Sequence, residues 1–204
     1  IFKDYFPLNR IFNVTNGVDL DYNFPKKHSK NINILFLSNL LKDKGITNVL
    51  DGFVEAFKVR KNITLSLVGV CNDLYIKKKI KLISEKYPVK YFGLADSKEK
   101  YKHFKKADIF IFPPIVPEGL PWCVIEALAS GLPIIITLNG NGCDLVKNNK
   151  NGFVVKDVNE ISNKITKLAH DTNLRLKMSK SSKKLYDERF TESQMVKEYS
   201  EVFK

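Results

Sequence analysis

The sequence contains little cysteine and no long run of apolar residues. Its three cysteines, Cys71, Cys123 and Cys143, are odd in number and lack the spacing of metal ligands, which argues against a disulfide scaffold or a zinc site. No run approaches the roughly 18 apolar residues that a transmembrane helix requires. The chain begins at Ile1 and shows no basic-then-apolar signal pattern, which is compatible with a piece of a longer protein.

Acidic residues are few relative to basic ones. Among 204 residues, 34 Lys+Arg stand against 22 Asp+Glu, which gives a net charge of +12. Nucleic acid, an anionic membrane surface or a phosphate-bearing substrate would each suit this surplus. Because 30 of the 34 basic residues are lysine, a compositional bias with lysines on solvated helix faces is the plainer explanation. A hydrophobic fraction of 44% with 27% charged residues excludes disordered and fibrous classes, and the length fits one compact domain.

Short apolar runs alternate with amphipathic segments along most of the chain. After a turn-rich lead-in over 1–31, the pattern predicts strands at 32–38, 63–69, 89–92, 108–113, 133–137 and 152–155. Between and after them it predicts helices over 46–57, 73–86 and 121–130 and over most of 157–204, with a surface helix at 173–190. A further helix is predicted to start at Ser97 as the N-cap, with Tyr101 and Phe104 facing inward. Near-continuous apolar strands are typical of a parallel sheet covered by helices on both faces. We therefore expect one α/β domain with a Rossmann-like, doubly wound core over 32–156 and C-terminal helices over 157–204 that pack back on it.

In such folds, ligands bind at the carboxyl ends of the strands. The loop after the first strand, Ser38 to Gly45, runs straight into a helix, whose N-terminus favours anions. Lys44 would add a full positive charge for a phosphate, and Gly45 would let the backbone approach closely. The alternative is a polar loop with a solvated lysine, because the segment matches no Walker or G-x-G-x-x-G pattern.

Glu126 is the only charged residue between Leu120 and Leu138. A carboxylate on so apolar a helix is costly when it is buried without a partner. One alternative is a structural partner, either a lysine or a backbone N–H. The other is a pair of ligand hydroxyls, since a carboxylate only accepts hydrogen bonds and suits a vicinal diol such as that of ribose.

Glu118 stands eight residues earlier, in the turn after the strand at 108–113. Pro121 suits the first position of the following helix, because its missing N–H would be unpaired there anyway. The amides of Trp122 and Cys123 would then point toward the crevice and could meet a phosphate or a sugar oxygen. The alternative for Glu118 is an exposed loop residue stabilised by the helix dipole.

With this E-x7-E arrangement the sequence resembles the nucleotide-sugar-binding half of a retaining GT-B glycosyltransferase of the GT4 group. The matching segments occur in order along nearly the whole chain, and each alone is weak. They are Asn16-Gly-Val-Asp19, the loop 37–45, Leu67-Val-Gly69, Val89-Lys-Tyr-Phe-Gly93, Ala107–Pro114, Glu118-Gly-Leu-Pro with Glu126-Ala-Leu-Ala-Ser-Gly-Leu-Pro133, and Asn151-Gly-Phe-Val-Val155.

The resemblance implies a role for each matching residue. Lys44 would neutralise the donor diphosphate, Glu126 would hold the ribose hydroxyls, and Glu118 would act as the catalytic residue at the hydroxyls of the transferred sugar. The remaining implied donor-binding residues are Asn39, Tyr91, Phe92 and Gly93, the last three beside the base, and Leu120, Pro121, Trp122 and Cys123, which line the sugar and phosphate. Cations and amides aimed at the leaving diphosphate are the device that such chemistry needs.

The chain departs from the family pattern at several positions. Ser38-Asn39 replaces a Gly-Arg pair that many members carry, so one phosphate cation is missing, and Lys42 is an alternative source of that charge. Pro121 replaces a glycine and removes one backbone donor. Asp144 stands where an acidic residue often closes a loop over the sugar. We expect no metal, because the D-x-D pair of Asp19 and Asp21 lies in the lead-in, and His28, His103 and His170 show no mutual spacing. Trp122 has two interpretations, stacking on a sugar or packing.

The implied function is metal-independent transfer of a sugar, with retention, from a nucleotide-diphosphate sugar to a lipid-linked glycan, polysaccharide or similar acceptor. We expect no cofactor, a UDP- or GDP-linked donor, a cytoplasmic enzyme with peripheral contact at the inner face of the membrane, and a role in capsule or lipopolysaccharide synthesis. The acceptor-binding N-terminal half is absent from the sequence, so the chain alone should bind donor and transfer little sugar. The alternatives are a basic nucleic-acid-binding module and a non-catalytic nucleotide-sugar-binding domain.

Overall fold

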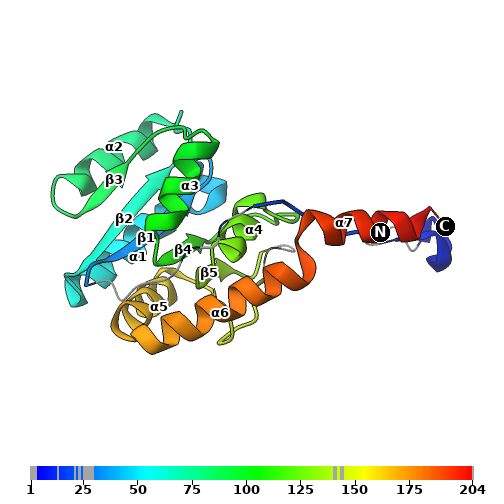
Figure 1. Ribbon diagram of the computed structural model, residues 1–204. Helices are drawn as coiled ribbons and strands as arrows, with labels where there is room; N and C mark the ends of the chain where they lie inside the picture. The colour runs from blue at the N-terminus through cyan, green and yellow to red at the C-terminus, as the bar shows by residue number, and fades with distance from the viewer. Residues whose placement is uncertain are drawn as a thin grey trace.

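The computed structural model describes residues 4–12, 14–20, 22, 24, 30–139, 142 and 145–203. Its centre is a sheet of six parallel strands in the order β3-β2-β1-β4-β5-β6 (Figure 1). The strands are β1 (Ile32–Leu37), β2 (Ile63–Val68), β3 (Val89–Tyr91), β4 (Ile109–Phe112), β5 (Ile134–Thr137) and β6 (Gly152–Val155). Every residue of β4 and β5 is buried, as the continuous apolar runs predict for a sheet covered on both faces.

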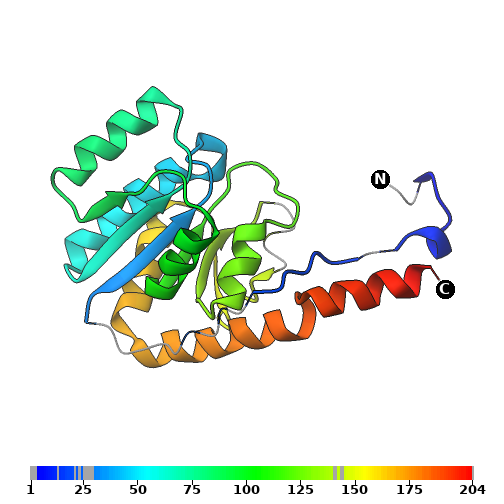
Figure 2. The same cartoon turned by 45° about the horizontal axis from the view of Figure 1, so that its top comes forward.

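Seven α-helices lie within the described residues, and all but the last pack around the sheet, whereas α7 extends away from it (Figure 1). They are α1 (Ile46–Val59), α2 (Leu74–Ser84), α3 (Ser97–Lys106), α4 (Trp122–Ala129), α5 (Val158–His170), α6 (Thr172–Arg189) and α7 (Glu192–Val202). Helix α1 packs against α5 and α2, and α4 packs against α6. Figure 2 shows α3 and α4 on the face of the sheet opposite to α1. This two-sided arrangement confirms the predicted doubly wound, Rossmann-like fold.

Two predicted helix starts are one residue off. Helix α3 is capped by Asp96, not by Ser97, because the Asp96 carboxylate accepts from the Glu99 amide while the Glu99 side chain accepts from the Asp96 amide. Pro121 is the N-cap of α4 and not its first helical residue. The inward orientation predicted for α3 holds for Phe104, which is fully buried. It is wrong for Tyr101, which is 37% exposed and packs edge-on against Phe24 of the lead-in.

Helix α6 is more deeply packed than a surface helix. Met178, Ser182 and Tyr186 are buried, and the Ser182 hydroxyl donates to the Leu132 carbonyl at 2.7 Å, which fastens α6 to the loop before β5. The sequence pattern missed this because most residues of α6 are polar. The lead-in then runs beside α7, where the Thr15 amide donates to the Glu198 carboxylate at 2.8 Å (Figure 2).

Candidate functional site

The strand order places a topological switch point between β1 and β4. From β1 the chain continues to β2 on one side, and from β4 it continues to β5 on the other, so the two loops separate at the carboxyl ends of these strands. A cleft of about 400 Å³ lies there. It is lined by Leu37, Ser38, Lys44, Lys100, Phe112, Glu118, Gly119, Leu120, Pro121, Trp122, Cys123 and Glu126.

A glycine lets the loop after β1 pack closely against the loop after β4. Gly45 has a φ of 79° and lies so close to Pro113 that a Cβ would overlap the Pro113 carbonyl oxygen. The Ile115 amide also donates to the Asp43 carbonyl at 2.8 Å. Only glycine combines the left-handed conformation with this close approach. The contact carries Lys44, the residue before Gly45, into the cleft.

Lys44 and Glu118 form an ion pair across the cleft between Nζ and Oε1. Their side chains are 26% and 17% exposed. Glu118 is therefore not an exposed loop residue, and Lys44 is not a fully solvated lysine. The pair joins the two loops that carry the predicted catalytic carboxylate and the predicted diphosphate cation.

Glu126 forms the second ion pair of the cleft. Its Oε1 atom lies 2.6 Å from Nζ of Lys100 in α3, and the Glu126 side chain is 12% exposed. A structural lysine partner was one of the two alternatives for this carboxylate, and in the free chain that alternative holds. The sequence did not identify Lys100, because α3 carries five lysines with no pattern that separates them. The structure separates them by burial, since Lys98, Lys102, Lys105 and Lys106 are exposed and Lys100 is half-buried.

The start of α4 forms the floor between the two ion pairs. No side chain caps this helix N-terminus, and within the described residues no backbone carbonyl is bonded to the amides of Trp122 and Cys123. The Trp122 ring is 52% exposed beside the cleft. Burial, with a further contribution from the Glu126 carboxylate, raises the pKa of the Cys123 thiol to about 12. A neutral thiol and two amide donors thus lie between charged pairs, an arrangement suited to an anionic ligand.

Four predicted donor-binding residues do not line this cleft. Asn39 is exposed in the loop after β1. Tyr91 is the last residue of β3, and Phe92 and Gly93 follow it at the same edge of the sheet, where the Tyr91 hydroxyl donates to the Gly69 carbonyl at 3.1 Å.

The aromatic side chain beside the predicted base site has a histidine neighbour. Phe92 meets the His103 ring edge-on at 4.6 Å between centroids, and burial lowers the pKa of His103. Phe92 itself is 49% exposed, so its ring keeps a free surface for a ligand that extends beyond the cleft.

Other residues named from the sequence lie elsewhere. Lys42 is exposed and does not line the cleft, so nothing in the geometry supports it as the missing phosphate cation. Asp21, His28, Cys143 and Asp144 lie outside the described residues. Within the part of the chain that the structure describes, no group of three or more His, Cys, Asp or Glu side chains is arranged to hold a metal ion.

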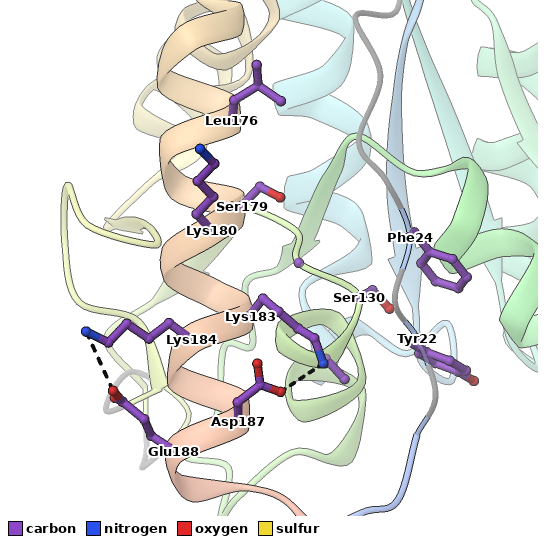
Figure 3. A pocket seen from close by; sticks show the side chains of 12 residues that line it. Tyr22, Phe24, Ser130, Leu176, Ser179, Lys180, Lys183, Lys184, Asp187 and Glu188 are labelled. Atoms are coloured by element: carbon purple, nitrogen blue, oxygen red, sulfur yellow. Dashed lines mark hydrogen bonds and ion pairs between the residues drawn. The ribbon is translucent and has the colours of Figure 1, made fainter.

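A second cavity, of about 500 Å³, lies at the opposite end of α4. Figure 3 shows it between Tyr22 and Phe24 of the lead-in, Ser130 after α4, and the lysine-bearing side of α6. Two of its lysines pair with carboxylates of their own helix, Lys183 with Asp187 at 2.9 Å and Lys184 with Glu188 at 3.6 Å. None of the predicted site residues lines this cavity.

Comparison of the sequence with protein families gives a match over residues 20–185 to the family described as Glycosyl transferases group 1. The chain belongs to this family. An uncharacterized glycosyltransferase of Methanocaldococcus jannaschii is 27% identical over 186 residues, which are 90% of this chain and 47% of that protein. The capsular polysaccharide biosynthesis glycosyltransferase CapM of Staphylococcus aureus is 27% identical over 177 residues, 84% of this chain and 46% of that protein. The chain thus spans about half the length of these relatives.

Solved glycosyltransferase structures share the fold. HepE of Anabaena, determined with UDP and glucose, superposes with a TM-score of 0.81 at 18% identity, over 93% of this chain and 55% of that one. The C-terminal domain of the glycosyl transferase group 1 protein LpcC of Francisella tularensis superposes with a TM-score of 0.75 at 22% identity. That alignment covers 86% of this chain and 100% of the LpcC domain. The predicted resemblance to one half of a GT-B glycosyltransferase is confirmed at the level of the fold. Among the helices that the structure describes, none is both long and apolar enough to cross a bilayer.

Proposed function

We propose that the cleft between β1 and β4 binds a nucleotide-diphosphate sugar and that this chain is the donor-binding half of a retaining, GT4-type sugar transferase. The observation that carries the proposal is the meeting of Lys44, Glu118, Glu126 and the uncapped start of α4 in one cleft at the switch point. These are the residues that the E-x7-E resemblance assigns to the donor.

Lys44 and the start of α4 would bind the diphosphate. In the free chain the Lys44 ammonium is held by Glu118. A diphosphate carries more negative charge than a carboxylate and brings several acceptor oxygens, so it would draw Lys44 away from Glu118 and toward the amides of Trp122 and Cys123. Lysine and amides would then stabilise the charge that develops on the leaving diphosphate, which is the metal-independent form of this chemistry.

Glu118, released from Lys44, would contact the hydroxyls of the transferred sugar next to the reacting carbon. Glu126 lies four residues into α4 from Trp122, one turn below the amides. A ribose attached to a diphosphate at the helix start would reach this depth, where the Glu126 carboxylate accepts from the ribose hydroxyls. The exposed Phe92 ring and the backbone after β3 would then meet the base, beyond the cleft itself.

The acceptor would be a lipid-linked glycan or polysaccharide bound by a second half of the enzyme. This proposal rests on the chain's covering about half of its relatives. We expect a UDP- or GDP-linked donor. Peripheral contact with an anionic membrane remains part of the proposal, because the lysines of α2, α3 and α6 are mostly exposed.

Titration calorimetry of the chain with UDP, GDP and ADP tests the proposal. We expect one of the three to bind with 1:1 stoichiometry and the chain alone to show little sugar transfer. Absence of binding by all three would refute a donor site in this cleft. Binding of single-stranded RNA or DNA with a steep salt dependence, in place of nucleotides, would favour the nucleic-acid-binding alternative.

A further inference from the structure

Lys100 lies in the cleft but has no part in the donor binding proposed above. It reaches from α3 to Glu126 of α4, with 2.6 Å between Nζ and Oε1, and its side chain is 32% exposed. It lines the same cleft as Lys44 and Glu118. We propose that Lys100 is a donor-contacting residue that hydrogen-bonds to the ribose hydroxyls together with Glu126. The inference rests on the proposed function, because it names a further residue of the same site.

The chemistry of a vicinal diol supports this assignment. Each ribose hydroxyl has one hydrogen to donate and lone pairs to accept, whereas a carboxylate can only accept. Glu126 alone would leave the hydroxyl oxygens without donors. The Lys100 ammonium has three N–H groups, and its hydrogen bond to Glu126 uses one. The pair therefore offers an acceptor, Oε2 of Glu126, beside further donors on Nζ of Lys100, which is the complement of a diol.

The alternative role for Lys100 is purely structural. A carboxylate on the apolar helix α4 needs a partner, and Lys100 supplies one in the free chain. This role acts only through Glu126, whereas a direct contact adds its own binding energy. The two roles predict different results when Glu126 is changed as well.

The experiment is a double-mutant cycle on nucleotide affinity. Calorimetry with UDP, GDP and ADP is carried out on the unmodified chain, Lys100→Met, Glu126→Gln and the double variant, with Lys102→Met as the matched control from the exposed side of α3. Met preserves most of the length and apolar volume of Lys. We expect Lys100→Met to weaken binding about tenfold, as for the loss of one hydrogen bond to a charged group. We expect it to weaken binding in the Glu126→Gln background as well, and Lys102→Met to have no effect.

Two further measurements keep the outcome decisive. With the 2′,3′-dideoxy form of the nucleotide that binds, Lys100→Met should have no effect, because the diol is absent. In the unmodified chain, saturating nucleotide should slow acetylation of Lys100 at least severalfold, measured by peptide mass mapping, and leave Lys102 unchanged. The labelling remains readable even where Glu126→Gln binds too weakly for the cycle.

The outcomes separate this inference from the proposed function. If none of the three nucleotides binds the unmodified chain, the proposed function fails. If a nucleotide binds but Lys100→Met matches the unmodified chain, or weakens binding only while Glu126 is present, the direct contact is refuted and the donor site stands. Equal loss with the dideoxy nucleotide would also refute the assignment, because Lys100 would then contact the phosphates.

Discussion

Alanine substitution of Glu126 should weaken nucleotide binding, whereas alanine substitution of Glu118 should not. Glu126→Ala removes the acceptor proposed for the ribose hydroxyls. Hydrogen bonds to a charged group contribute about 1.5–3 kcal/mol each, so the loss of one or two should weaken nucleoside diphosphate binding roughly 10- to 100-fold or more.

Glu118→Ala removes the ion-pair partner of Lys44. In the free chain Lys44 is held by Glu118, with the two side chains 26% and 17% exposed. A partly exposed ion pair contributes on the order of 1 kcal/mol at most. Releasing Lys44 from this competition should leave the affinity for a nucleoside diphosphate unchanged or raise it up to about fivefold. Sugar transfer by the complete enzyme should fall, because Glu118 is proposed to contact the hydroxyls of the transferred sugar.

The assay is calorimetry with UDP, GDP and ADP on the unmodified chain and both variants. Thermal unfolding of each variant serves as the control for folding. Equal losses of affinity in the two variants would refute the assigned roles, as would a larger loss for Glu118→Ala. If both variants lose affinity and also have a much lower melting temperature, the titration is repeated well below the lower of the two melting temperatures. A loss of affinity that persists there is a loss of binding contacts and not of folding.

Three further predictions concern the surroundings of the cleft. Gly45→Ala should lower the free energy of unfolding in urea by more than about 2 kcal/mol, because a Cβ would overlap the Pro113 carbonyl. The matched control is Gly93→Ala, at a similar φ of 74° with open space around it, which should lower the free energy of unfolding by only about 1–2 kcal/mol. Equal losses in the two variants would contradict the close approach of Gly45 to Pro113. Because its pKa is raised to about 12, Cys123 should react with iodoacetamide far more slowly at pH 8.5 in the folded chain than in urea. The alkylation rate of Cys123 in the folded chain should keep rising with pH beyond pH 9. An alkylation rate that levels off near pH 9 would show a thiol of ordinary pKa. Asp96→Ala should lower the free energy of unfolding in urea by about 1 kcal/mol through loss of the α3 cap. An unchanged free energy of unfolding would show that the cap contributes nothing to stability.

Much of the fold was predictable because its signals are local. The apolar runs of β1, β2, β4 and β5 cannot remain exposed, and their continuity indicates burial on both faces of a parallel sheet. The errors came where two local rules compete. Asp96 and Ser97 are both good caps, and the carboxylate with its reciprocal Glu99 contact forms the cap. The burial of α6 was missed because Ser182, a polar residue, is buried there, and its hydroxyl is satisfied by a long-range hydrogen bond to Leu132 that no sequence pattern indicates.

The candidate site was predictable in part for a related reason. Lys44, Glu118 and Glu126 follow strand ends or lie one turn into the next helix, so the topology alone brings them to one edge of the sheet. Lys100 was not predictable, because its place depends on how α3 is rotated against α4. The pairing of Lys44 with Glu118 also depends on the tertiary contact of two loops. Because Glu118 holds Lys44 in this pair, Glu118 is expected to compete with the nucleotide for that lysine.

The most direct test of a donor site in this cleft uses the fluorescence of Trp122. It is the one tryptophan of the sequence, it is 52% exposed, and it lines the cleft beside Glu126. With excitation at 295 nm, titration with UDP, GDP and ADP should give a saturable change in Trp122 emission for at least one nucleotide. The same change should be much weaker in Glu126→Ala and with the nucleoside alone. No change with any nucleotide at millimolar concentration, or calorimetric binding that leaves Trp122 emission unaltered, would contradict the account.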